Sequence, residues 1–116
     1  MNVRIYHNPR CSKSRQTLAL LNDRGIEAEV IEYLETPPDA ATLANLAGQL
    51  GVSLRDLLRT GEEEYKQARE HVDAMDDAAL ASWMTTHPKV IQRPIVVSAK
   101  GARIGRPPET VLEILG

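Results

Sequence analysis

The sequence predicts an α/β fold. A βαβ unit at the start of the chain and a ββα unit at its end form a mixed four-stranded sheet, and a helical insert lies between these units in the sequence. Short runs rich in β-branched residues occur near the two ends of the chain, and residues 40–87 have a mainly helical pattern. The chain has 116 residues, which is the length of one domain. We therefore predict a single domain, residues 1–116, with the helical insert at about residues 39–88.

The first segment predicts a strand, a loop and a helix. Val3 and Ile5 lie in a predicted strand that ends near His7, and the turn-forming pair Asn8-Pro9 follows. Ser12 is expected to cap a helix, and Gly25 is expected to end it.

A second strand is predicted from the alternation of apolar residues that begins at Ile26 and continues to about Tyr33. A helix between two strands normally joins them in parallel, through a right-handed crossover. Helices are then expected near residues 40–50, 54–59, 62–70 and 77–86, with strands at residues 94–97 and 102–104. Pro107-Pro108-Glu109 is typical of the start of a last helix.

The composition is that of a globular protein, with 42% hydrophobic and 26% charged residues. The chain has no Phe, one Trp and three Tyr, so the core is expected to be aliphatic. No apolar stretch approaches the length of a signal peptide or a membrane span. Cys11 is the one cysteine and cannot form an intrachain disulfide, which favours a reducing, cytoplasmic compartment. We expect no bound metal.

Charge is segregated along the chain. Residues 1–15 and 89–106 contain basic but no acidic side chains, whereas residues 16–88 are strongly acidic. The formal net charge is −2, which argues against a nucleic-acid-binding domain. Ten of the fourteen cationic residues are Arg, whose planar guanidinium suits oxyanion binding. The sequence therefore favours a small anion as ligand and gives no indication of nucleic acid or membrane as a partner.

Cys11 is the candidate nucleophile. A lone cysteine is often a small buried apolar residue. Here it lies between a predicted strand and a predicted helix start, where free amide groups and the helix dipole favour an anion, and cationic side chains flank it. A free thiol of pKa near 8.5 is only about 3% thiolate at neutral pH, so a lowered pKa would greatly increase the reactive fraction.

The neighbours of Cys11 leave two assignments open. Ser14 stands where a dithiol redox protein has its second cysteine, so an external thiol must complete any redox cycle. The Ser14 hydroxyl either hydrogen-bonds the thiolate or serves the first turn of the helix. His7 either supports the thiolate or ends its strand with the ring in solvent.

Three arginines are candidates for holding an oxyanion: Arg59, Arg93 and Arg106. Arg93 directly precedes Pro94 at the start of a predicted strand, where a cis peptide bond is one of two isomers that the sequence allows. Arg106 directly precedes Pro107. A multiply charged oxyanion requires several such groups, but their spacing along the chain does not show that they meet.

Five separated motifs carry a resemblance to a known family: IYHNPRCSKSR at residues 5–15, YLETPP at 33–38, LLR at 57–59, QRPIVV at 92–97 and IGRP at 104–107. In this order they resemble the glutaredoxin-coupled arsenate reductases of bacteria (ArsC-like), within which the chain is most similar to the short chromosomal, YfgD-like branch. The resemblance covers essentially the whole chain. It implies a thioredoxin-like fold with a helical insert.

The resemblance also implies a function. The Cys11 thiolate would attack arsenate, glutathione would join the arsenic as co-substrate, and glutaredoxin would reduce this Cys-arsenate-glutathione intermediate so that arsenite leaves. Arg59, Arg93 and Arg106 would bind the oxyanion, His7 would help to keep Cys11 ionised, and Ser14 would contact the thiolate. No tightly bound cofactor is implied.

Two other functions remain open from the sequence. One is a thiol-dependent reductase of another oxidant or of a mixed disulfide. The other is a non-catalytic regulator that binds a protein partner, as Spx-like relatives do. Ser14 disfavours the second, because a two-cysteine switch cannot form in this chain.

Overall fold

The computed structural model describes residues 2–115 and divides the chain into two compact units. Unit 1 is formed by the two ends of the chain, up to Thr36 and from Arg93 onward, and unit 2 is formed by Pro37–Gln92. The predicted helices of the insert all lie in unit 2. Whether the whole chain acts as one domain remains a prediction.

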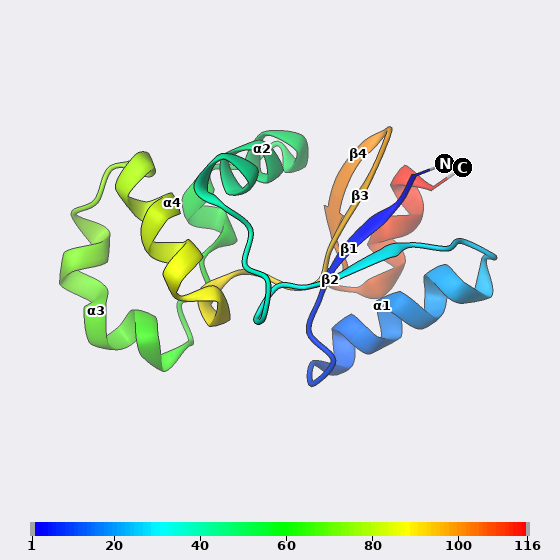
Figure 1. Cartoon of the computed structure of the whole chain (residues 1–116), viewed down its shortest axis with the longest axis horizontal. Helices are drawn as coiled ribbons and strands as arrows, with labels where there is room; N and C mark the ends of the chain where they lie inside the picture. The colour runs from blue at the N-terminus through cyan, green and yellow to red at the C-terminus, as the bar shows by residue number, and fades with distance from the viewer. Residues whose placement is uncertain (1, 116) are drawn as a thin grey trace. The chain divides into compact units, whose positions relative to one another are not determined.

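Unit 1 contains the sheet and the elements that follow its strands (Figure 1). These elements are β1 (Arg4–His7), α1 (Ser12–Asp23), β2 (Glu29–Glu32), β3 (Ile95–Ser98), β4 (Gly101–Ile104) and the 3₁₀ helix η3 (Pro108–Ile114). The strand order is β2-β1-β3-β4, with β1 parallel to β2 and the other two pairings antiparallel. This arrangement confirms the predicted βαβ opening, ββα ending and mixed four-stranded sheet.

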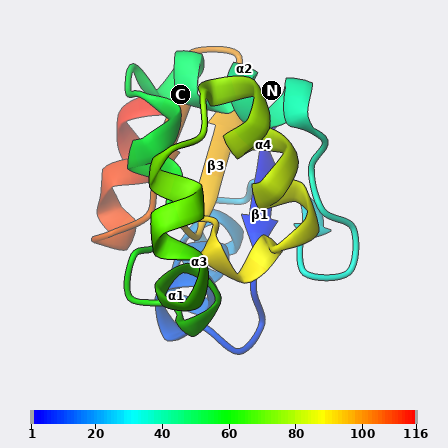
Figure 2. The same ribbon diagram turned by 90° about the vertical axis from the view of Figure 1, so that its left-hand side faces the viewer.

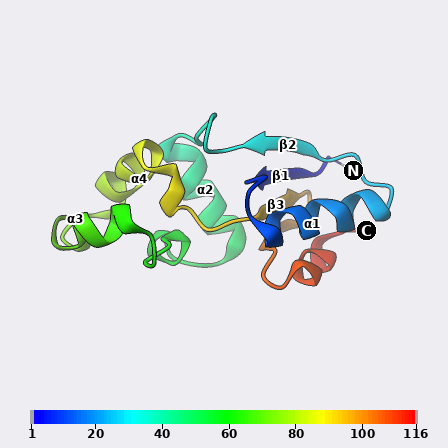
Figure 3. The same cartoon turned by 90° about the horizontal axis from the view of Figure 1, so that it is seen from below.

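The core of unit 1 lies between the sheet and the pair α1 and η3, which pack side by side (Figure 3). Its buried members are all aliphatic: Val3, Ile5, Leu21, Val96, Val111 and Ile114. Burial of one such side chain contributes about 1.5–3 kcal/mol to folding. The core cluster therefore agrees with the aliphatic core expected from the composition.

Unit 2 is mainly helical (Figure 2). It contains α2 (Ala40–Leu50), η1 (Leu54–Leu57), α3 (Glu63–Asp73), α4 (Asp77–Thr86) and η2 (Pro88–Val90), of which η1 and η2 are 3₁₀ helices. The helices α2, α4 and η1 pack against one another through buried residues that include Leu43, Leu46, Leu54, Leu57, Leu80 and Met84. Within residues 2–115, no helix is both long enough and apolar enough to cross a membrane.

Three local predictions are wrong. Cys11, not Ser12, is the N-cap residue of α1, and Ser12 is the first helical residue. The second strand is shorter than predicted, because the Ile26 N–H donates to the Leu21 carbonyl at 3.0 Å and keeps Ile26 at the end of α1. The helix expected at residues 54–59 ends at Leu57, because Leu58 is extended and pairs with Ile91.

Candidate active site

The loop between β1 and α1 holds Cys11 through backbone and side-chain hydrogen bonds. The Cys11 N–H donates to the Asn8 carbonyl at 3.0 Å, and the Arg10 N–H donates to the Asn8 side-chain oxygen at 3.0 Å. Arg15 reaches back from α1, and its Nη1 donates to the Pro9 carbonyl at 2.9 Å. Asn8 is itself buried. The loop is therefore tied at both ends, and it presents a half-buried Cys11 thiol at the start of the helix.

The position of Cys11 explains why the predicted serine cap is absent. An N-cap side chain normally accepts the N–H of the second or third helical residue. In α1 these residues are Lys13 and Ser14, and their N–H groups favour the thiolate of Cys11, although the thiol makes no capping hydrogen bond of standard geometry. No acidic residue lies in the first turn of α1. The positive end of the helix is thus left available to the sulfur and to an anion beside it.

Two of the three predicted arginines meet Cys11 in unit 1. Arg106 Nη2 donates to Cys11 Sγ at 3.5 Å, although the two residues are 95 positions apart in the sequence. Arg106 Nε donates to the Arg93 carbonyl at 2.8 Å, which ties the two arginines together. The Arg93 guanidinium also hydrogen-bonds the Cys11 side chain. The peptide bonds before Pro94 and Pro107 are both cis.

These contacts lower the pKa of the Cys11 thiol. Burial is the largest single effect and opposes ionisation, but the Ser14 N–H, the Arg93 guanidinium, the Lys13 N–H and the charge of Arg106 together outweigh it. Each of these groups binds the charged form of the sulfur better than the neutral form. The predicted reactive thiolate therefore has a physical basis in the structure.

Arg93 is held by a residue that the sequence reasoning missed. Burial disfavours the charge of Arg93, but Tyr33 and Cys11 more than offset this effect and raise the pKa of the guanidinium. The Tyr33 side chain is fully buried and hydrogen-bonds Arg93. Tyr33 stands directly after β2, within the motif at residues 33–38, and this place in the motif was the available signal.

His7 and Ser14 form a buried pair behind the loop. His7 Nδ1 and Ser14 Oγ are 2.6 Å apart, and Ser14 Oγ also accepts the Asn8 N–H at 3.0 Å. The structure thus excludes the interpretation of His7 as a solvent-exposed end of its strand, since its exposed fraction is 6%. Burial lowers the pKa of His7; the charge of Arg15 adds to this effect and Glu32 opposes it. The lowered pKa disfavours a positive charge on His7, and the roles of His7 and Ser14 at Cys11 remain predictions.

Gly105 and Thr17 bring the end of β4 close to α1, and the sequence reasoning missed both. A Cβ atom at Gly105 would lie 2.5 Å from Thr17 Oγ1 and 2.8 Å from Pro94 Cγ. The Gly105 N–H donates to the Pro94 carbonyl at 2.9 Å, so the backbone is fixed on that side. Because Arg106 follows directly, the close approach at Gly105 places its guanidinium at the sulfur.

Arg59, the third predicted arginine, lies in unit 2. Its N–H donates to the Val90 carbonyl at 2.6 Å, and its Nε lies 3.9 Å from the Glu62 carboxylate. Arg59 is therefore fixed within unit 2 by the same backbone pairing that ends η1. Its role in oxyanion binding remains a prediction.

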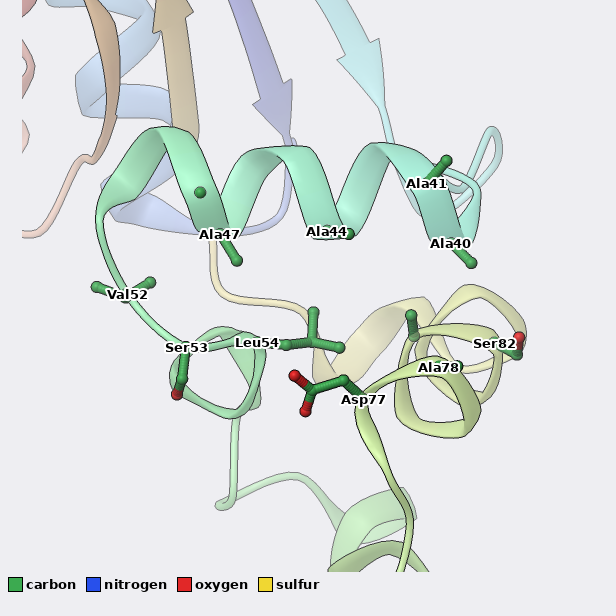
Figure 4. Close-up of a pocket in the computed structure, with 12 residues that line it drawn as sticks. Ala40, Ala41, Ala44, Ala47, Val52, Ser53, Leu54, Asp77, Ala78 and Ser82 are labelled. Carbon is green, nitrogen blue, oxygen red and sulfur yellow. The ribbon is translucent and has the colours of Figure 1, made fainter.

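Unit 2 also has an apolar groove of about 540 Å³ along α2 and α4, which Figure 4 shows. Small side chains dominate its lining, including Ala40, Ala44, Ala47 and Ala78, with Asp77 as its one charged residue. Its two hydroxyl side chains are Ser53, whose Oγ donates to Asp56 Oδ2 at 3.1 Å, and Ser82, and no histidine, lysine or cysteine lines the groove beside them. Within residues 2–115, no three His, Cys, Asp or Glu side chains are grouped as a metal site. The chemistry of the described chain is thus concentrated around Cys11.

Comparison with known proteins identifies the family. The sequence model of the ArsC family matches residues 6–114. The chain belongs to the ArsC family. This membership confirms the resemblance drawn from the five motifs, and the topology of unit 1 agrees with the thioredoxin-like fold that the resemblance implied.

Individual ArsC relatives cover almost the whole chain. YfgD of Escherichia coli K12 is 55% identical over 98% of this chain and 97% of its own length. A protein named arsenate reductase from the same strain is 46% identical over 98% of this chain and 81% of its own length. The solved structure of an arsenate reductase from Vibrio cholerae is 53% identical, with a TM-score of 0.94 over 99% of this chain and 98% of that protein.

Proposed function

We propose that this chain is an oxidoreductase that reduces arsenate to arsenite, with glutathione and a glutaredoxin as the source of electrons. The observation that carries the proposal is the Cys11 thiol of lowered pKa, which two guanidinium groups contact at an open helix start. Family members named arsenate reductase support the same substrate. We place this activity in the cytoplasm.

The first step joins the sulfur to arsenic. The Cys11 thiolate attacks arsenic(V), a sulfur–arsenic bond forms, and one arsenate oxygen leaves as water after protonation. Arg93 and Arg106 bind the remaining oxygens of the adduct in this proposal, which their interactions with the sulfur support. Each charge-assisted hydrogen bond of this kind contributes about 1.5–3 kcal/mol. Arg59 is proposed as a third cation at the same oxyanion.

The electrons come from outside the chain, because Cys11 is its one cysteine. Glutathione adds its sulfur to the arsenic with loss of a second water. A glutaredoxin thiolate then attacks the glutathione sulfur and forms a mixed disulfide, so that two electrons pass to arsenic and reduce it to arsenic(III). Water releases arsenite, and the thiolate of Cys11 is regenerated. His7 and Ser14 act as positioning residues for the loop throughout.

The test is NADPH consumption in a mixture of the protein, glutathione, glutathione reductase and glutaredoxin, with and without arsenate. We expect consumption that depends on arsenate and that falls at least about a thousandfold in Cys11→Ser, since a covalent nucleophile is removed. Omission of glutaredoxin should also stop turnover. Turnover with disulfides but none with arsenate would replace arsenate reduction with a thiol-dependent reductase activity.

A further inference from the structure

A second pocket lies beside the Cys11 loop, on the side of β1 that pairs with β2. Its volume is about 220 Å³, and it is lined by residues 7–10 together with Glu32, Leu34 and Glu35. We call it the β2-side pocket. The strand order places β3, the strand that follows Arg93, on the opposite side of β1. The proposed oxyanion site, as described above, does not use the β2-side pocket.

His7 gives this pocket an unused polar atom. The imidazole lines the pocket, is 6% exposed, and pairs its Nδ1 with Ser14. Its other nitrogen, Nε2, has no hydrogen-bond partner in residues 2–115. Solvent reaches Nε2, since it is not one of the fully buried side-chain atoms that lack a partner. The Nε2 atom is therefore available to a ligand in the pocket.

The pocket also has charged side chains of both signs, one of which, Glu32, acts on the neighbouring His7. Arg10, Glu32 and Glu35 line it, and in residues 2–115 none of their side chains forms an ion pair. Two carboxylates complement an ammonium group, and a guanidinium complements a carboxylate. This combination suits a zwitterion better than it suits an oxyanion such as arsenate, which the two carboxylates would repel.

The reaction needs an external thiol close to Cys11, and Arg10 is the residue directly before Cys11. Glutathione ends in an amino acid group with both an ammonium and a carboxylate, separated from its thiol by several bonds. We propose that the β2-side pocket binds this γ-glutamyl end of glutathione, with the ammonium at Glu32 and Glu35 and the carboxylate at Arg10. The inference rests on the proposed function, since it assigns a site to the co-substrate of that reaction.

Steady-state kinetics test the assignment. In Glu32→Gln and in Glu35→Gln we expect the KM for glutathione to rise about two- to fivefold, as is usual for exposed charge pairs, with the KM for arsenate unchanged. Glu29→Gln is the matched control, because Glu29 lies on the same strand but pairs with Arg4. Cysteinylglycine, which lacks the γ-glutamyl group, should support slower turnover that the pocket substitutions leave unchanged. Equal KM values for glutathione in all three variants would overturn the assignment.

A binding measurement separates this proposal from the activity. S-Methylglutathione has no free thiol, so its binding does not require turnover. We expect it to shift the amide NMR signals of residues 7–10 and 32–35 in the unmodified protein and much less in the Glu32→Gln/Glu35→Gln variant. If these shifts were seen but the protein did not turn over arsenate, the glutathione site would be supported and the proposed arsenate reductase activity would be contradicted. Turnover with arsenate but no shifts at these residues would keep the function and remove the site.

Discussion

The helix starts of the two units differ in what occupies the N-cap. In unit 2, Asp39 accepts the Thr42 N–H and Asp76 accepts the Ala79 N–H, each at 2.8 Å. In unit 1, the N-cap of α1 is Cys11, which makes no capping hydrogen bond. In both units the amide groups at the helix start stabilise a negative charge, since the Thr42 N–H lowers the pKa of Asp39 and the Ser14 N–H helps to lower that of Cys11.

The difference shows how one local structure serves two purposes. The aspartates of unit 2 close their helix ends and stabilise them. At α1 the same amides favour the Cys11 thiolate, and the guanidinium groups of Arg93 and Arg106 favour it as well. The start of α1 therefore contributes less to folding and more to reactivity. Substitutions at the two kinds of helix start should separate these two contributions.

Among substitutions that leave Cys11 in place, the largest expected effect is at the arginines of unit 1. Arg93→Ala and Arg106→Ala should each lower kcat/KM for arsenate by about 10- to 100-fold, because each removes a charge-assisted hydrogen bond at the reacting atoms. Both should also raise the pKa of Cys11, since both groups favour its thiolate. Steady-state kinetics and the pH dependence of alkylation measure the two effects.

Arg103→Ala is the control for this pair. Arg103 lies on β4, close in sequence to Arg106, but its Nε pairs with Glu113 at 2.9 Å. Its removal should leave both the kinetics and the thiol pKa near their original values. An equal loss of activity in Arg103→Ala would show that net charge, and not contact with the sulfur, accounts for the effect.

Glycine-to-alanine substitutions should change the free energy of unfolding in opposite directions in the two units, because the space around the two glycines differs. Gly105→Ala places a Cβ against Thr17 and Pro94, and overpacking of this kind costs about 1–3 kcal/mol of unfolding free energy. Gly48→Ala in α2 meets no atom within 4 Å and should stabilise the protein by up to about 1 kcal/mol. Urea denaturation measures both changes.

A positioning role for Gly105 has a readout that a purely structural role lacks. If Gly105 positions the Arg106 guanidinium beside the Cys11 sulfur, Gly105→Ala should raise the pKa of Cys11 even in conditions where the protein is fully folded. A second substitution, Thr17→Ala, relieves the closest contact and should return part of that shift. A folded Gly105→Ala protein with an unchanged thiol pKa would contradict the positioning role.

Removal of a cap in unit 2 should affect stability alone. Asp76→Ala loses the hydrogen bond to Ala79 and should lower the free energy of unfolding by about 1 kcal/mol. The alkylation kinetics of Cys11 should not change. If Asp76→Ala changed the pKa of the Cys11 thiol, the N-cap of α4 would not act on stability alone, and the contrast with the N-cap of α1 would be wrong.

The smallest effect is the pH dependence of stability. The folded protein holds the pKa of Cys11 below its value in the unfolded chain. Between these two pKa values the unfolded chain binds more protons, so stability rises with pH across that window and is lost as pH falls through the folded pKa. Cys11→Ser should lack this rise. His7, whose pKa is also lowered, contributes a similar rise at lower pH that the variant retains.

The sequence predicted the elements that local chemistry decides. The helix at residues 40–50 was correct because Asp39 and Gly51 mark its ends, and Gly51 has the left-handed φ of 72° that favours glycine. The ends of the second strand and of the helix at residue 54 were wrong. The strand begins late because the Ile26 N–H donates to the Leu21 carbonyl at the end of α1, which the apolar alternation does not show. The helix ends early because Leu58 pairs with Ile91 in a distant segment, which no local pattern contains.

The candidate site was predictable to a similar extent. Cys11 and its lowered pKa followed from a strand, a loop and a helix start, which are neighbours in the sequence. The contact of Arg106 with the sulfur spans 95 residues, so motif resemblance and not spacing indicated it. Gly105 lies in the motif at residues 104–107 and Thr17 in none, but the close approach between β4 and α1 that gives both their importance is shown only by the three-dimensional packing.

The most direct test of the account is the rate at which iodoacetamide alkylates Cys11, measured against pH in the folded protein. We expect a midpoint well below the value near 8.5 of a free thiol. The midpoint should move upward in Arg93→Ala and Arg106→Ala and stay in place in Arg103→Ala. A midpoint at or above 8.5 would show that burial outweighs the amides and guanidinium groups, and would contradict the central claim of an activated thiolate.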